Sequence, residues 1–128
     1  MERERDEILR EVVRHHGQYR GEAYAFLLEA LDFTIQRRGK GRKHVSGPDL
    51  MEGFRDYAVQ QFGFLARVVL CEWGIRTTDD VGEIVFHLIE EDLLQKTADD
   101  RREDFHDLFD FSEAFEEGFR STLANVVI

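Results

Sequence analysis

Residues 48–94 read PDLMEGFRDYAVQQFGFLARVVLCEWGIRTTDDVGEIVFHLIEEDLL, and this stretch decides the fold. It contains three apolar patterns of helix length, separated at Gly63 and Gly74. Apolar residues recur in it at intervals of three and four, the spacing that places them on one side of a helix. The stretch therefore predicts three consecutive helices that form a core for the flanking segments to cover.

The first and third helices of this stretch carry explicit start signals. Ser46 precedes Pro48 and stands three residues before Asp49, which is the spacing of a capping box with proline in the first turn. Thr77 precedes Asp79 and Asp80, so a capping hydroxyl and two acids meet the positive end of the next helix dipole. These signals predict helix starts near residues 47 and 78.

The middle run, Phe64 to Trp73, is apolar on nearly all sides, with only two charged residues. A helix without a polar side is usually buried, so the run is predicted to lie inside the protein. The single cysteine, Cys71, falls in this run and is predicted to be a small buried hydrophobic residue. Gly74 is predicted to end the helix in a left-handed conformation, with Ile75 making the accompanying hydrophobic contact.

Further helices are predicted on both sides, over residues 2–16, 19–38 and 112–124. The predicted fold is therefore mainly α, a single domain over residues 1–128 of about five helices, with a core at 20–112. Its centre has a helix-turn-helix-like outline. Residues 95–111 fit two readings: the phenylalanines alternate as in a small β-hairpin near the C-terminus, or they share a helix face. We favour the hairpin.

A helix-turn-helix outline is typical of DNA-binding proteins, but the charges of its second helix argue against DNA binding here. The helix that would enter the major groove carries Asp79, Asp80, Glu83, Glu90 and Glu91 and has no lysine or arginine. Contacts to phosphate supply most of the affinity for nucleic acids, and this surface would repel phosphate. We therefore expect no sequence-specific DNA binding.

The net charge of −10 is unevenly distributed along the 128 residues. From Asp79 onward, fifteen acidic residues stand against four basic ones, whereas five cations crowd into residues 37–43. Two glycines give this basic loop, residues 37–44, backbone freedom, and its cations suit phosphate oxygens or an acidic partner. Alternatively, residues 37–44 form a solvated connector whose cations interact favourably with the negative end of the preceding helix dipole. The candidate binding residues are Arg37, Arg38, Lys40, Arg42, Lys43, His44 and Ser46.

No catalytic or metal-binding signature is present in the sequence. Adjacent His15 and His16 point about 100° apart on a helix and make a poor metal pair. Glu103 and His106 have the spacing of one di-iron half-site, but such a site needs two of these motifs. We expect no cofactor, no metal and no catalytic residues.

The N-terminus lacks the apolar segment of a signal peptide, and no stretch approaches the roughly 20 apolar residues of a membrane span. We therefore expect a cytoplasmic protein without a membrane partner. The apolar tail, residues 125–128, suits docking on the core or self-association into a homo-oligomer. Phe33 and Tyr24 are expected to lie beside the basic loop and to extend its contact surface.

Several short motifs resemble those of a bacterial family of short proteins of unknown function, sometimes labelled Minf-type. The similarity covers roughly residues 20–112 and implies a stand-alone bacterial protein, with no activity, cofactor or catalytic residue to carry over. The motif His44-Val45-Ser46-Gly47 adjoins the basic loop and is the part to examine first for a site. The matching residues are Ala30 to Thr34, His44 to Gly47, Leu50, Phe62-Gly63, Trp73 to Ile75, Asp79, Gly82 to Phe86 and Asp104-Phe105.

The sequence thus favours a small, acidic, non-catalytic interaction or adaptor module of the bacterial cytoplasm, with an unknown protein partner. The alternative is an RNA- or ribosome-associated protein that binds phosphates through residues 37–44. A metal-dependent enzyme ranks third.

Overall fold

A computed structural model describes residues 2–38, 44–96 and 100–116 and gives a mainly α-helical fold, as predicted. None of the described residues forms a β-strand. The elements are α1 (Glu2–His16), α2 (Gly21–Arg38), α3 (Gly47–Phe62), the 3-10 turn η1 (Gly63–Leu65), α4 (Ala66–Glu72), α5 (Thr78–Glu90) and the 3-10 turn η2 (Arg102–Phe105).

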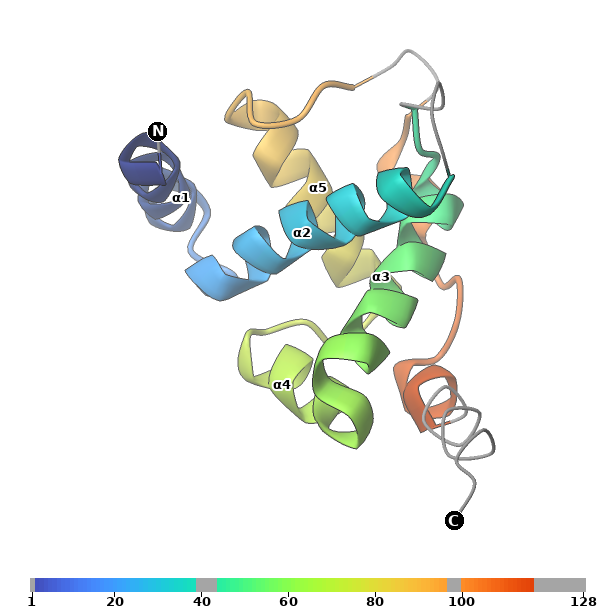
Figure 1. Cartoon of the computed structure of the whole chain (residues 1–128). Helices are drawn as coiled ribbons and strands as arrows, with labels where there is room; N and C mark the ends of the chain where they lie inside the picture. The colour runs from blue at the N-terminus through green and yellow to red at the C-terminus, as the bar shows by residue number, and fades with distance from the viewer. Residues whose placement is uncertain (1, 39–43, 97–99, 117–128) are drawn as a thin grey trace.

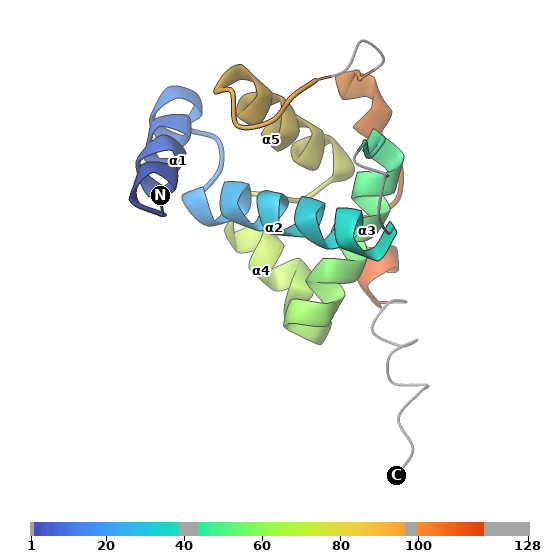
Figure 2. The ribbon, with the colours of Figure 1, turned by 45° about the horizontal axis from the view of Figure 1, so that its top comes forward.

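Helices α2, α3 and α5 form the centre of the molecule, and the other elements pack around them (Figure 1). α1 lies at the outer side, where it contacts α2 and α5. α4 lies at the end of α3, and η2 lies beside the start of α3 and against α5 (Figure 2). η2 therefore closes the side of the bundle opposite to α1.

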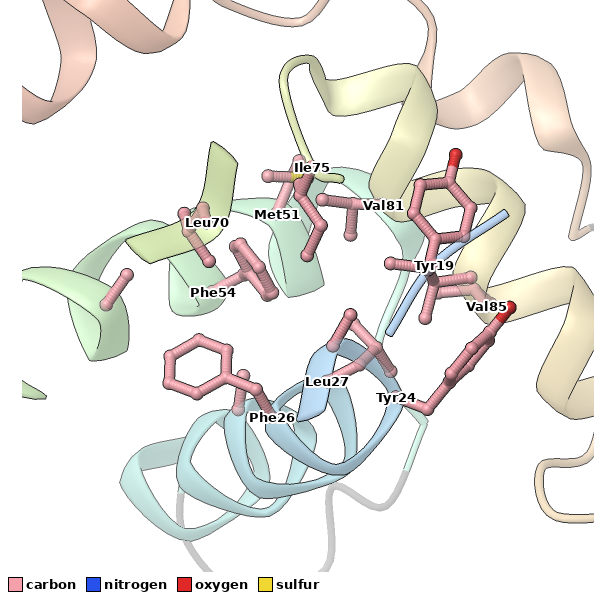
Figure 3. Close-up of a cluster of buried hydrophobic side chains, with 14 of the residues drawn as sticks. Tyr19, Tyr24, Phe26, Leu27, Met51, Phe54, Leu70, Ile75, Val81 and Val85 are labelled. Carbon is pink, nitrogen blue, oxygen red and sulfur yellow. The ribbon is translucent and has the colours of Figure 1, made fainter. Parts of the chain in front are cut away.

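The core is formed by side chains that α2, α3, α4 and α5 direct toward one another (Figure 3). Phe54 of α3 is fully buried and meets the ring of Phe26 edge-on, with 5.4 Å between ring centroids. Leu27, Met51 and Leu70 are also fully buried around them. Burying a side chain of this size stabilises a fold by roughly 1.5–3 kcal/mol, so these helices hold one another in place.

The helix boundaries follow the predicted signals. Ser46 accepts a hydrogen bond from the backbone N–H of Asp49 at 3.2 Å and caps α3. Thr77 and Asp80 form a capping box at the start of α5. Gly74 has a left-handed φ of 95°, and the N–H of buried Ile75 donates to the carbonyl of Leu70 at 2.8 Å. The sequence therefore predicted these ends correctly.

The crossing of α2 and α3 depends on Gly53. A Cβ at this position would lie 1.9 Å from Oγ1 of Thr34, which is buried and donates to the carbonyl of Ala30. Only a residue without a side chain lets the two backbones approach this closely.

The prediction that the run from Phe64 to Trp73 is buried was wrong for one side of it. Phe64, Leu65 and Val68 are 67%, 46% and 63% exposed, and Cys71 is exposed as well. The physical reason is the place of η1, which carries Phe64 and Leu65 and has no buried residue, and the length and place of α4. α4 has only seven residues at the end of the bundle, so it buries the side that carries Ala66 and Leu70 and presents the other to solvent.

The hairpin favoured for residues 95–111 is also absent from the part of this segment that the structure describes. Residues 102–105 form η2 instead, and Phe105 is buried at 4% exposure. An isolated hairpin has nothing to stabilise it, whereas η2 inserts one phenylalanine between α3 and α5. The alternation of phenylalanines therefore reflects single buried contacts and not a strand.

Helical structure resumes at residues 111–116, within the predicted last helix, and residues 117–124 of that prediction lie outside the described residues. Its start is capped by Asp110, whose Oδ1 accepts from the N–H of Glu113 at 3.1 Å. Ser112, the first residue of the predicted helix, accepts a hydrogen bond from Arg67 at 3.1 Å.

Candidate functional site

An apolar pocket of about 230 Å³ opens between α2, the start of α3, α5 and η2. Its wall is mostly aliphatic and aromatic, and its polar residues are His44, Gln95, Asp100, Arg101 and Asp104. The apolar lining consists of Leu31, Ile35, Val45, Leu50, Val85, Phe86, Ile89, Leu94 and Phe105.

Two glycines position the η2 wall of this pocket. A Cβ on Gly82 of α5 would lie 2.7 Å from Cβ of Phe105, and a Cβ on Gly47 of α3 would lie 2.9 Å from Cβ of Asp104. Real Cβ atoms do not approach so closely, so η2 can seat only because both positions lack a side chain. Gly82 is therefore a point of close contact between α5 and η2.

Arg102 fastens η2 to α5 from the solvent side. Its guanidinium lies 3.5 Å from Glu83, 3.3 Å from Glu90 and 5.4 Å from the centroid of the Phe86 ring. These groups are partly exposed, and surface ion pairs contribute at most about 1 kcal/mol each. The burial of Phe105 therefore holds the pocket wall, and Arg102 adds to it.

The mouth of the pocket carries charges of both signs. Nε2 of His44 lies 3.9 Å from Oδ1 of Asp100, and the backbone N–H of Arg101 donates to Asp104 at 3.0 Å. Arg38 donates to the carbonyl of His44 at 3.4 Å and pairs with Asp49 at 3.1 Å. The mouth is thus polar and mixed in charge around an apolar interior.

The predicted binding residues divide into three groups. His44 lines the pocket, whereas Ser46 uses its hydroxyl to cap α3. Arg37 pairs with Asp56 at 2.7 Å and lies over the Phe33 ring, and Arg38 pairs with Asp49. Lys40, Arg42 and Lys43 lie outside the described residues. The described cations of the basic loop are therefore already paired with carboxylates of α3.

Tyr24 does not flank the basic loop, which corrects the expected contact surface. It is fully buried, and its hydroxyl lies 2.9 Å from Nδ1 of His87. Burial raises the pKa of Tyr24 to about 12, so the hydroxyl keeps its proton at neutral pH. The reason is the helix face: Tyr24 points toward α5, while Phe33 lies near α3 and stacks obliquely on Tyr57.

A second polar cluster lies on the opposite side of α5, where α1 packs. His87 is 5% exposed, and its ring stacks on that of His16 with 3.9 Å between centroids. His16 approaches Glu90 and Glu91 at 3.6 and 3.5 Å, and His15 approaches Glu91 at 2.6 Å. Neither the His16 ring nor the His87 ring lines the apolar pocket.

The sequence missed the burial of His87. The residue lies off the apolar stripe of its helix, and such a position usually faces solvent. α1, which is some seventy residues away in the chain, covers that second face. The histidine pair His15-His16 was the available signal, but only the folded contact shows that one of them meets His87.

Tyr19 and His106 each engage an acid at the start of α5. The Tyr19 hydroxyl donates to Asp80 at 2.7 Å, and burial together with that carboxylate raises the pKa of Tyr19. The exposed His106 lies 2.9 Å from Asp79, and this hydrogen bond raises the pKa of His106. Both contacts fix loops to α5 and neither opens into the pocket.

Within residues 2–38, 44–96 and 100–116, no three histidine, cysteine or acidic side chains gather so that they could hold a metal ion. None of the helices described there combines the length and the apolar character needed to cross a membrane.

Comparisons with protein-family models, with curated proteins and with solved structures find no match for this chain. The resemblance to the Minf-type family therefore stays a prediction. What the arrangement can do is read from its chemistry: the pocket can enclose one apolar group while its mouth makes polar contacts.

Proposed function

We propose that this protein is a non-catalytic interaction module that captures an apolar side chain of a partner protein in the pocket between α2, α3, α5 and η2. The bacterial cytoplasmic setting expected from the sequence is part of this proposal. The observation that carries it is the pocket itself, an apolar interior with a polar mouth.

The size of the pocket supports a single side chain as its occupant. Drug-sized ligands occupy pockets of roughly 300–1,000 Å³, and this one has about 230 Å³. Protein partners commonly insert one aromatic or aliphatic anchor into such a pocket, with polar contacts around it that exclude water. His44, Asp100 and Arg101 would supply those contacts here.

Peptide display tests this proposal. Random peptides selected on the full chain are expected to share one large apolar residue. Val45→Phe adds volume to the pocket wall and should abolish their binding. Val68→Phe makes the same change on the exposed side of α4 and should leave binding intact. Selected peptides without a shared apolar residue, or equal binding to both variants, would contradict the proposal.

RNA is the alternative class of partner. Measuring the binding of total RNA at two salt concentrations tests this alternative. Arg37 and Arg38 are paired with Asp56 and Asp49, which opposes phosphate contacts by these two cations. We therefore expect no binding of total RNA at either low or high salt. Salt-sensitive RNA binding that is lost when Arg37, Arg38, Arg42 and Lys43 are replaced by alanine would establish the RNA reading instead.

A further inference from the structure

The contact between α1 and α5 is built around two stacked histidines. The rings of His16 and His87 lie 3.9 Å apart and within 14° of parallel, and His87 is 5% exposed. The Tyr24 hydroxyl lies 2.9 Å from Nδ1 of His87, while Nε2 of His87 lies 3.8 Å from Glu83. α1 therefore covers a buried histidine ring, the side-chain type whose charge changes in the mildly acidic range.

Charged and titratable groups face this pair from every element around it. α1 contributes His16 and His15, α2 contributes Tyr24, and the segment after α1 contributes Tyr19, whose ring centroid lies 6.0 Å from that of His87. η2 contributes Arg102, which acts on His87 as a like charge. α5 itself carries the carboxylates: Glu83 near His87, and Glu90 and Glu91 near His16.

Detachment of α1 would remove some neighbours of His87 and leave others in place. Burial and the neighbouring His16 lower the pKa of His87, and Glu83 and Glu90 act in the opposite direction. His16, whose ring stacks on that of His87, belongs to α1, so detachment of α1 would uncover that face of the His87 ring. Glu83 and Glu90 belong to α5 and stay beside His87. A proton on His87 is therefore better accommodated with α1 detached than with α1 docked.

We propose that α1 is a proton-released cover, which packs on α2 and α5 at neutral pH and detaches as the buried His87 ring, on which His16 stacks, becomes charged. Detachment exposes Val12, which is fully buried in the docked state, together with the half-buried Leu9 and Val13. Acidification would thus present a new apolar helix face to a partner. This inference is independent of the pocket, which lies on the other side of α5.

Amide hydrogen exchange of the full chain, corrected for the intrinsic pH dependence, tests it. Amides of residues 9–16 should lose protection as the pH falls below the ordinary histidine pKa of about 6.5, by up to roughly tenfold per pH unit for one proton. Amides of α2 near Leu27 and Ala30, in the fully buried core, should keep theirs. Parallel loss of protection in both helices, or no loss in α1, would overturn the proposal.

His87→Asn removes the titrating ring and keeps a polar atom near Tyr24, so it should make the protection of α1 independent of pH between 5 and 7 (roughly the range in which histidine titrates). His16→Asn is the second variant and should flatten the response from the α1 side. His106→Asn is the matched control at an exposed histidine and should respond like the unchanged protein. An unaltered pH response in both stack variants would refute the proton-released cover.

Discussion

The two sides of α5 differ in one physical respect. On the side of α1, polar groups surround a buried histidine: His87 has Tyr24, His16 and Glu83 as neighbours. On the side of η2, apolar side chains leave about 230 Å³ unfilled. Apolar space that is large enough for a side chain favours an apolar occupant, whereas a buried histidine among polar groups favours a response to protons. We therefore expect an apolar ligand on one side of α5 and a response to pH on the other.

The largest effect is expected from removing Phe105, the side chain that η2 inserts between α3 and α5. Phe105→Ala should lower the free energy of unfolding by about 3–5 kcal/mol, because a buried aromatic ring is lost and a cavity remains. Leu108→Ala, at a residue that is 38% exposed, is the control and should change stability by less than about 0.5 kcal/mol. Urea denaturation measures both. A loss below about 1 kcal/mol for Phe105→Ala would show that η2 does not hold the pocket wall.

A smaller effect on stability is expected when a methyl group is added on α5 opposite Phe105. Gly82→Ala places Cβ 2.7 Å from Cβ of Phe105, so η2 must shift. Overpacking costs about 1–3 kcal/mol, and the better helix propensity of alanine offsets part of it, leaving a net loss of about 1–2 kcal/mol. Gly21→Ala, whose Cβ would lie 3.7 Å from Val13, is the matched helical control and should be neutral or stabilising. Equal effects at the two glycines would contradict the close approach.

The contact between Tyr24 and His87, on the α1 side of α5, is tested by removing the Tyr24 hydroxyl. Tyr24→Phe leaves Nδ1 of the buried His87 without this partner and should cost about 1 kcal/mol. Tyr57→Phe, at a half-buried ring, is the control and should cost less because water reaches that position. Thermal unfolding followed by circular dichroism measures the difference. Equal costs would indicate that the Tyr24–His87 contact contributes nothing beyond packing.

The smallest expected effect is the pH dependence that one histidine gives to unfolding. The pKa of His87 is lowered in the folded protein. Its contribution to stability is therefore complete above about pH 6.5 and is lost as the pH falls through the lowered value. His106 has a raised pKa and the opposite sign, so its contribution is lost as the pH rises through that value. Denaturation midpoints of His87→Asn between pH 5 and 7.5 should fall less on acidification than those of the unchanged protein. A steeper fall would contradict a lowered pKa of His87 in the folded protein.

Local signals in the sequence predicted the helices well. Ser46, Gly74 and Thr77 act within a few residues of themselves, so caps and helix ends could be located without knowledge of the fold. The exposed side of α4 could not be predicted in this way. Its residues are apolar, but burial depends on where a short helix lies in the bundle, and neighbours distant in the chain decide that.

The candidate site was predicted only in part for the same reason. Three residues of the motif His44-Val45-Ser46-Gly47 line one wall of the pocket: His44, Val45 and Gly47. The remaining walls come from α2, α5 and η2, which meet only in the folded chain. The cations Arg37 and Arg38 looked available in the sequence, and it is their pairing with Asp56 and Asp49 in α3 that changes this reading.

The most direct test of the account is a titration of methyl-labelled protein with N-acetyl-tryptophanamide, a mimic of an apolar anchor residue, followed by NMR. We expect saturable shifts of the methyl groups of Ile35, Val85 and Ile89 in the pocket, and no shifts of Val12, which is fully buried on the α1 side. Val45→Phe should abolish the shifts, and Val68→Phe should preserve them. Unchanged pocket methyls, or equal shifts on both sides of α5, would contradict the claim that this pocket accepts the side chain of a partner.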